Sequence, residues 1–368
     1  MINTTYYQDL TKMNTFGMKV KARCFIEYDS VADLVDIEFE ELARPVIHIG
    51  GGSNLLFTDD FKGTILHSKI NFIEILDDCH FDRAERVEKS VEPVFVSVGA
   101  GVVFDDFCDW AAKEGLWGVE NLSYIPGEVG ASAVQNIGAY GVEVKDVIKT
   151  VYCYDTVEEE FVSFDVEDCE YGYRDSVFKD PEIKGRYIVT HVVFALSRTP
   201  QPRLDYGHLR DAVIAASARH CEEGQSPDVA IFTPSLIRKV IIKIRKEKLP
   251  EPSVMGSAGS FFKNPVISAD HFARIEATAK AELGTDYKVP HYDLPDGTVK
   301  VPAAWMIEQC GWKGKRSGGA AVYDKQPLVL VNYTGEAYPE EIIGLERRII
   351  ASVKAKFDIV LHPEVEHI

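Results

Sequence analysis

The sequence lacks the features that mark secreted, membrane and disulfide-bonded proteins. No apolar run approaches the roughly 18 residues of a membrane span, and residues 1–16 have neither the basic nor the apolar region of a signal peptide. The cysteines are odd in number and contain no C-x-x-C pair. We therefore expect a cytoplasmic protein without membrane contact, whose thiols are reduced and mostly buried. The seven cysteines are Cys24, Cys79, Cys108, Cys153, Cys169, Cys221 and Cys310.

Positive charge is scarce. The chain has 368 residues, of which 58 are acidic and 40 basic, and its formal net charge is -18. A surface of this sign repels polyanions, which excludes a general nucleic-acid binder. A local basic pocket could still bind a small anionic ligand. With 46% hydrophobic residues the chain is an ordinary globular protein, and its length suffices for two or three domains of about 150 residues.

Several catalytic motifs are also absent. The ten histidines form no H-E-x-x-H or other compact ligand pattern, so we expect no metal centre. There is neither a G-x-x-x-x-G-K-[ST] loop nor a G-x-S-x-G turn, which argues against P-loop phosphoryl transfer and α/β-hydrolase chemistry. No internal repeat is present.

The first glycine-rich turn comprises residues 50–54. It follows the apolar run 45–49, and residues 55–57 and 63–66 after it are again typical of strands. A Rossmann unit would need a third glycine where Leu55 stands, and a helix behind it. The alternatives that remain are a phosphate-binding turn and a tight hairpin.

The second glycine-rich segment spans residues 115–144. Its only charges are Glu120, Glu128 and Glu143. Successive main-chain N–H groups in such turns can form an anion-binding nest suited to a diphosphate. The alternative is close packing of turns that require small residues. Two such segments on β-rich frameworks favour a large dinucleotide over a mononucleotide.

Helical periodicity appears in three places. Apolar residues from 103 to 111 have helical spacing and end at Gly115; residues 340–357 follow a proline and have acids first and lysines last. Residues 234–248 form an amphipathic helix with the densest basic charge in the chain. We expect most of these basic side chains to be solvated, with Lys248 as the exception.

Five motifs occur in an order that is typical of one family. The chain resembles the UDP-N-acetylenolpyruvoylglucosamine reductases, flavoenzymes of bacterial peptidoglycan precursor synthesis, over nearly its whole length. The motifs are Gly50-Gly51-Gly52-Ser53-Asn54-Leu55-Leu56, Ile125-Pro126-Gly127 through Gln135-Asn136-Ile137-Gly138-Ala139-Tyr140-Gly141, Tyr173-Arg174-Asp175-Ser176-Val177-Phe178, Gly259-Ser260-Phe261-Phe262-Lys263-Asn264-Pro265 and His362-Pro363-Glu364-Val365.

The resemblance implies an α+β protein with a two-lobed FAD-binding fold of the vanillyl-alcohol-oxidase type and a third α+β domain for substrate. The implied domains are residues 1–70 (first FAD-binding lobe), 71–232 (second lobe, to which 358–368 return) and 233–357 (substrate-binding domain). It further implies FAD and NADPH as cofactors, small-molecule partners only, and a monomer.

The family's ligand-binding positions transfer to this sequence residue by residue. For FAD they are Gly50, Gly51, Gly52, Ser53, Asn54, Ile125, Pro126, Gly127, Gly130, Ser132, Gln135, Asn136, Gly138, Ala139 and Tyr140. For the sugar-nucleotide substrate they are Tyr173, Tyr206, Lys248, Asn264, Tyr292, Lys313 and Gln326. Residues 204–207 resemble the mobile tyrosine loop of the family's longer subtype, so Tyr206 is expected to cover the diphosphate.

The implied reaction has its own chemical demands. Hydride addition to the terminal carbon of an enolpyruvyl ether places negative charge on the neighbouring carbon and its carboxylate. A preorganised donor stabilises such charge by about 3 to 4 kcal/mol, and Arg174 matches this role. Glu364 matches an acidic partner, which helps only when it carries a proton. Ser260 matches the donor of a proton to the carbanion, a role that contributes a factor of roughly 100 to 10,000.

Two departures from the family pattern and two rival functions remain. Ala133-Val134 stands where many relatives have a proline, and Glu366 stands where an arginine is frequent.

The rival functions are another FAD oxidoreductase of the same fold and a flavin or sugar-nucleotide binding protein without turnover. The expected cations of the site, within an acidic protein, are Arg174, Lys248, Lys263 and Lys313.

Overall fold

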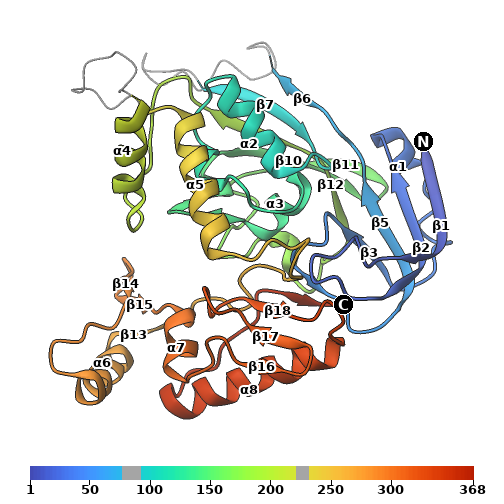
Figure 1. Ribbon diagram of the computed structural model, residues 1–368. Coiled ribbons are helices and arrows are strands. Elements are labelled where there is room, and N and C mark those ends of the chain that lie inside the picture. Colours follow the sequence, from blue (N-terminus) through green and yellow to red (C-terminus); the bar gives the residue numbers. More distant parts are fainter. Residues whose placement is uncertain (77–92, 221–231) are drawn as a thin grey trace. The chain divides into compact units, whose positions relative to one another are not determined.

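The computed structural model describes residues 1–76, 93–220 and 232–368. They form two compact units (Figure 1). Unit 1 comprises residues 1–8, 22–51 and 61–247, and unit 2 comprises 9–21, 52–60 and 248–368. The three-domain division stays a prediction. In the described part of the chain no helix is long and apolar enough to cross a membrane.

Unit 1 contains a four-stranded sheet in the order β1-β2-β5-β3. Strand β5 pairs in parallel with both β2 and β3. The predicted strands before and after the first glycine turn are therefore confirmed. The turn follows the edge strand β3, which pairs in parallel with β5, and it leads into another strand and not into a helix. The elements are β1 (Ile2–Asp9), β2 (Lys21–Tyr28), α1 (Val31–Val35), β3 (Val46–Ile49) and β5 (Phe61–Ser68).

The second sheet of unit 1 has five strands in the order β11-β10-β12-β7-β6, all pairs antiparallel. Helices α2 and α3 lie over one of its faces, where the Phe107 ring is 4.7 Å from that of Phe194 (Figure 1). The strands are β6 (Ile73–Ile75), β7 (Val94–Gly99), β10 (Ile148–Asp155), β11 (Glu160–Asp165) and β12 (Tyr187–Leu196). The helices are α2 (Phe104–Lys113), α3 (Val129–Gln135), α4 (Leu209–His220) and α5 (Pro234–Lys248). Short elements are β8 (Gly138–Ala139), β9 (Val142–Glu143), η3 (Glu120–Leu122), η4 (Val144–Asp146) and η5 (Val177–Lys179).

Unit 2 is built on small antiparallel sheets covered by helices. Strands β16-β17-β18 pack against α8, while β13-β15-β14 pack against α6. Helix α8 begins at the proline expected at its N-terminus and is followed by Asp358, which has the left-handed conformation. The strands are β4 (Leu55–Leu56), β13 (Val266–Ser268), β14 (Tyr292–Asp293), β15 (Thr298–Lys300), β16 (Arg316–Ser317), β17 (Ala320–Val322), β18 (Leu330–Asn332) and β19 (Glu366–His367). The helices are α6 (Ala269–Leu283), α7 (Ala303–Gln309) and α8 (Pro339–Phe357).

The predicted thiol state can be compared for five of the seven cysteines. Cys24, Cys108, Cys153 and Cys169 are free and buried, and Cys310 is free and partly buried. The prediction of mostly buried thiols is confirmed for these five, and their reduced state stays a prediction. Cys79 and Cys221 lie outside the described residues.

Candidate active site

The two glycine-rich segments lie against each other in unit 1. A Cβ atom placed on Gly51 would be 3.6 Å from Gly127 Cα, and one on Gly50 would be 3.1 Å from the Ala131 Cβ. Gly51 and Pro126 are exposed. Segments about 75 residues apart in the sequence thus combine into one solvent-accessible surface of main chain, which is the geometry expected of a diphosphate cradle.

The first turn continues into unit 2, where Gly52 is buried in the left-handed region at φ +61°. A Cβ there would overlap the main-chain oxygen of Met13. Thr15 fixes the same turn, because its N–H donates to Gly52 O and its hydroxyl to Ser53 O, at 3.2 and 3.4 Å. Glycine is therefore required at position 52 by the approach of the main chain.

Helix α3 occupies the second segment, but its first N–H groups are already used. Val129 N donates to Val102 O at 2.9 Å, and Gly130 N donates to Ala100 O at 3.0 Å. A Cβ on Gly130 would be 2.9 Å from the Ala100 Cβ, which explains the glycine. These two N–H groups therefore hold the helix to the segment that follows β7, and the assignment of Gly130 to FAD stays a prediction.

The end of α3 is held by side chains that the sequence assigned to FAD. Asn136 is buried in the left-handed conformation, and its amide donates to Glu143 Oε2 at 2.9 Å and Gly172 O at 2.8 Å. Gln135 Oε1 accepts a hydrogen bond from Lys179 at 2.9 Å. Ser132 donates to Val129 O within the helix. These hydrogen bonds within the protein fix the conformation of the Gln135-Asn136 motif.

Arg174 is brought to the same motif. Its guanidinium donates to Asn136 O at 3.2 Å and Gly138 O at 2.6 Å, and it lies 5.8 Å from the centre of the Tyr173 ring. Arg174 itself has φ +56°, a strained conformation for a residue with a side chain. The candidate carboxylate-binding arginine and the candidate FAD segment are therefore joined by hydrogen bonds. Ala139, another predicted FAD residue, follows Gly138 directly in this segment.

Two tyrosines that the sequence assigned to different ligands, Tyr140 to FAD and Tyr206 to the substrate, also meet in unit 1. The Tyr140 and Tyr206 rings meet edge to face with centres 6.0 Å apart, and Tyr206 is 45% exposed. Arg245 was not among the predicted site residues, yet it lies beside Tyr140: burial raises the pKa of Tyr140, and the charge of Arg245 opposes this. Its Nε donates to Tyr124 O at 3.0 Å.

The expected solvated face of α5 is correct for Lys239, Lys243 and Lys246, which are exposed, and wrong for two arginines. Lys248, the predicted exception, is exposed as well, and its contact with substrate stays a prediction. Arg238 donates to Asp105 and to Asp109 on α2, and its side chain is 11% exposed. Arg238 and Arg245 are seven residues apart, so they share one face of the helix. The signal that could have separated them from Lys239, Lys243 and Lys246 is their position relative to the fully buried Ile241, which lies three residues after Arg238 and four before Arg245.

In unit 2, Ser260 and Glu364 lie on neighbouring extended segments. Phe261 N donates to Leu328 O and Glu364 N to Phe261 O, both at 2.8 Å, and Ser260 forms a bridge with Val329. Both Ser260 and Glu364 are partly buried. Two of the three predicted catalytic residues are thus positioned by one irregular antiparallel arrangement.

The remaining predicted substrate residues are spread through unit 2. Asn264 Oδ1 accepts a hydrogen bond from Ala303 N at the start of α7, at 2.9 Å. Lys313 is exposed and pairs with Glu308 at 2.7 Å. Gln326 O accepts from Val329 N at 3.0 Å, and Tyr292 on β14 is 47% exposed. Their roles stay predictions.

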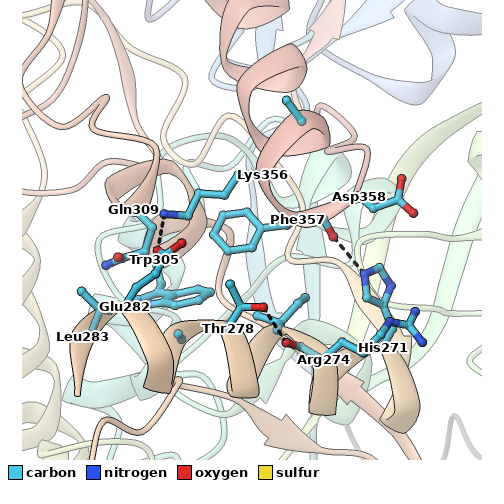
Figure 2. A pocket seen from close by; sticks show the side chains of 13 residues that line it. His271, Arg274, Thr278, Glu282, Leu283, Trp305, Gln309, Lys356, Phe357 and Asp358 are labelled. Carbon is cyan, nitrogen blue, oxygen red and sulfur yellow. Dashed lines mark hydrogen bonds and ion pairs between the residues drawn. The ribbon is translucent and has the colours of Figure 1, made fainter. Parts of the chain in front are cut away.

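A cavity of about 250 Å³ lies elsewhere in unit 2, between α6 and the end of α8 (Figure 2). None of the predicted site residues lines it. Polar groups on its wall are engaged with one another: His271 contacts Phe357 O at 2.9 Å, and Lys356 pairs with Glu282 at 3.0 Å (Figure 2). The described residues contain no group of three or more side chains suited to a metal ion.

The residues present fit FAD. The cradle is formed by the main chain of two glycine turns that approach each other at Gly51 and Gly127, and an arginine and two tyrosines adjoin its second turn. A family model described as an FAD binding domain matches residues 22–159. The chain is an FAD-binding oxidoreductase of α+β class, and this part of the predicted fold class is confirmed.

The comparisons then identify the family. A model described as the C-terminal domain of UDP-N-acetylenolpyruvoylglucosamine reductase matches residues 251–368. The chain is 49% identical to the enzyme of that name from Bacteroides fragilis strain YCH46, over 98% of both chains. It is 43% identical to that from Porphyromonas gingivalis strain ATCC 33277, over 98% of this chain and 97% of the relative. The chain belongs to the UDP-N-acetylenolpyruvoylglucosamine reductase family.

A solved structure has the same fold. The crystal structure of UDP-N-acetylenolpyruvylglucosamine reductase (MurB) from Thermus caldophilus matches with a TM-score of 0.61 and 21% sequence identity, covering 100% of this chain and 98% of that one.

Proposed function

We propose that this chain reduces UDP-N-acetylglucosamine enolpyruvate to UDP-N-acetylmuramate at the expense of NADPH, in peptidoglycan precursor synthesis. The similarity to the family over nearly the whole chain supports this reaction. The structural observation that supports FAD as the cofactor is the contact between the Gly50–Gly51 turn and Gly127. We further propose that it works as a cytoplasmic monomer on small molecules, with the three domains given above.

When bound, FAD would accept hydride from NADPH and deliver it to the terminal methylene carbon of the enolpyruvyl group. The turns at residues 50–54 and 125–127 would hold its diphosphate. Tyr140 and the main chain of 135–139 would flank the ring. Tyr206 would cover the substrate diphosphate, and its exposed ring, which meets Tyr140 edge to face, leaves it accessible for this role.

Arg174 would hold the enolpyruvyl carboxylate. Its planar fork suits a carboxylate better than a lysine ammonium does, and two carbonyl contacts fix its orientation before substrate arrives. A fixed donor stabilises developing charge without reorganisation. Glu364, in its protonated form, would share this role.

Ser260 would supply the proton. Hydride addition leaves an electron pair on the carbon next to the carboxylate, and the Ser260 hydroxyl would transfer its proton there, so that one new C–H bond comes from hydride and one from the serine. The Ser260 segment is held by main-chain hydrogen bonds on both sides of the serine, which gives the hydroxyl a defined position.

The test is steady-state oxidation of NADPH by the purified full chain. We expect consumption of NADPH to depend on the enolpyruvyl sugar nucleotide, and mass spectrometry to find a product two hydrogen atoms heavier than the substrate. UDP-N-acetylglucosamine, which has no enolpyruvyl group, is the control and should support no turnover. A flavin-containing protein that binds the sugar nucleotide and oxidises no NADPH would favour the binding-protein rival.

A further inference from the structure

His67 joins two carboxylates at the base of the first glycine turn. Its Nδ1 lies 3.1 Å from Glu27 Oε1, and its Nε2 lies 2.9 Å from Glu128 Oε1. In the parallel sheet His67 is opposite Glu27 on one side and Ile49 on the other. Because Gly50 follows Ile49, the imidazole lies at the end of the strand from which the turn departs, where parallel sheets bind ligands.

The carboxylate of Glu128, which contacts His67, also lies against the glycine turn. A Cβ on Gly50 would be 3.2 Å from Glu128 Oε2, and one on Gly51 would be 3.8 Å from Glu128 Oε1. The Glu128 side chain is 12% exposed, and that of His67 is 6% exposed. A carboxylate that is nearly buried therefore supports the turn from within, and His67 fixes its position.

We propose that His67 is a positioning residue of the FAD site, which holds Glu128 against the Gly50–Gly51 turn and neutralises the carboxylate charge beside the bound diphosphate. The inference rests on the proposed function, since FAD is taken as the ligand of the turn. It assigns a purpose to Glu128, an acid that would otherwise repel the phosphates.

The charges around His67 balance when its ring is protonated. Glu27 and Glu128 are the anions, and Lys69, whose Nζ is 3.5 Å from Glu27 Oε1, is the second cation. Two negative and two positive charges then sum to zero. Loss of the His67 proton leaves one net negative charge next to the turn.

Two further titratable groups face this cluster and stay neutral. His48 on β3 has its Nε2 2.8 Å from the Tyr28 hydroxyl on β2. Burial, with the nearby charge of His67, lowers the pKa of His48 to about 3. Burial raises the pKa of Tyr28. Neither changes charge near neutral pH, so His67 is the group that titrates there.

The direction of titration follows from the contacts. Burial by itself lowers the pKa of His67, but the hydrogen bonds and charge of Glu128, followed by the hydrogen bond of Glu27, raise it above its ordinary value of 6.5 overall. Folding therefore favours the protonated ring. The stability that this provides is fully present below pH 6.5 and is lost as pH rises through the higher folded-state pKa. Binding of an anionic diphosphate should weaken over the same pH range.

The experiment measures FAD binding to the apoprotein of the full chain, from flavin fluorescence, between about pH 5.5 and 9. We expect wild-type affinity to fall about tenfold as His67 deprotonates, which corresponds to about one pKa unit of coupling. His67→Gln should bind with the weaker affinity across the whole range. Glu128→Gln, which keeps an acceptor for His67 without the charge, should move the fall to lower pH, because Glu128 is the main group that raises the pKa of His67. His191→Gln, a partly buried histidine of the same unit, is the control and should titrate like wild type.

The outcomes are distinguishable. A pH-dependent fall retained in His67→Gln would overturn the inference, as would a wild-type affinity that does not change with pH. If the wild-type apoprotein takes up no FAD at any pH, the proposed function itself fails. Should His67→Gln not fold, as judged by circular dichroism, Glu128→Gln decides the question by the same measurement.

Discussion

The side-chain amide of Asn54 donates a hydrogen bond to the main-chain oxygen of Glu364, 3.0 Å away and 310 positions later in the chain. Strand β19 extends this contact by pairing in parallel with β4, while Glu364 N donates to Phe261 O. A residue assigned to FAD and two segments assigned to catalysis therefore share one hydrogen-bonded framework within unit 2. The C-terminal segment is therefore held from two sides.

The Ser260 hydroxyl is the predicted proton donor, and Ser260→Ala removes it. We expect reduction by NADPH to proceed nearly unchanged, while reoxidation by the enolpyruvyl substrate slows at least about a hundredfold, because only the second half-reaction needs the proton. Anaerobic stopped-flow absorbance measures the two steps separately. Ser257→Ala in the same segment is the control, and equal losses in both steps of Ser260→Ala would disprove the assignment.

Arg174→Lys keeps the positive charge but not the planar fork. We expect reoxidation by substrate to slow by roughly ten- to a hundredfold, because lysine cannot hold two carbonyls and a carboxylate in one plane. The same stopped-flow assay applies, with the exposed Arg198→Lys as control. Normal turnover of Arg174→Lys would mean that Arg174 only stabilises the turn around Gly138.

Alanine substitutions at Gly52 and Gly17 distinguish the cost of steric overlap from the cost of backbone strain. Both have positive φ, +61° and +66°, but a Cβ on Gly52 would overlap Met13, whereas a Cβ on Gly17 would meet nothing within 4 Å. Gly17→Ala should cost about 1 to 2 kcal/mol of unfolding free energy, from strain alone. Gly52→Ala should cost more and should also weaken FAD binding. Denaturant unfolding checks this, and equal losses in the two variants would contradict the structure.

Arg238 links α5 to α2 through Asp105 and Asp109. Arg238→Ala leaves both carboxylates without this partner, and we expect a loss of about 1 to 3 kcal/mol in unfolding free energy. This loss of unfolding free energy is smaller than for a fully buried ion pair, because the side chains of Asp105 and Asp109 are 24% and 40% exposed to solvent. Lys239→Ala, on the exposed face, should stay within about 0.5 kcal/mol of wild type. An equal effect of the two variants would show that the link adds no stability.

Much of the local structure could be predicted from the sequence, because periodicity and turn residues determine it. The helix at 234–248 agrees with α5 (Pro234–Lys248), and that at 340–357 differs from α8 by its first residue only. The apolar run Leu328-Val329-Leu330-Val331 is typical of a strand, but β18 is Leu330–Asn332, since Leu328 and Val329 contact the Ser260 segment through isolated hydrogen bonds and bridges. Such pairing depends on residues distant in the chain.

The site was harder to predict where its parts meet through space. The sequence singled out both glycine segments, but their contact depends on how β3 and α3 pack. Glu128 was noted as one of three charges among the glycines, yet its partner His67 lies 61 positions away. Nothing local distinguishes His67 from an ordinary strand histidine. Its role becomes visible only once the parallel sheet places Glu27 and the turn on either side of it.

The most direct test of the proposed function is a single turnover without oxygen. The purified protein should carry a flavin spectrum that one equivalent of NADPH bleaches, and the spectrum should return on addition of UDP-N-acetylglucosamine enolpyruvate but not of UDP-N-acetylglucosamine. Stoichiometric UDP-N-acetylmuramate should form in the same sample. A bleached protein that stays bleached after the enolpyruvyl substrate is added would contradict the proposed reaction.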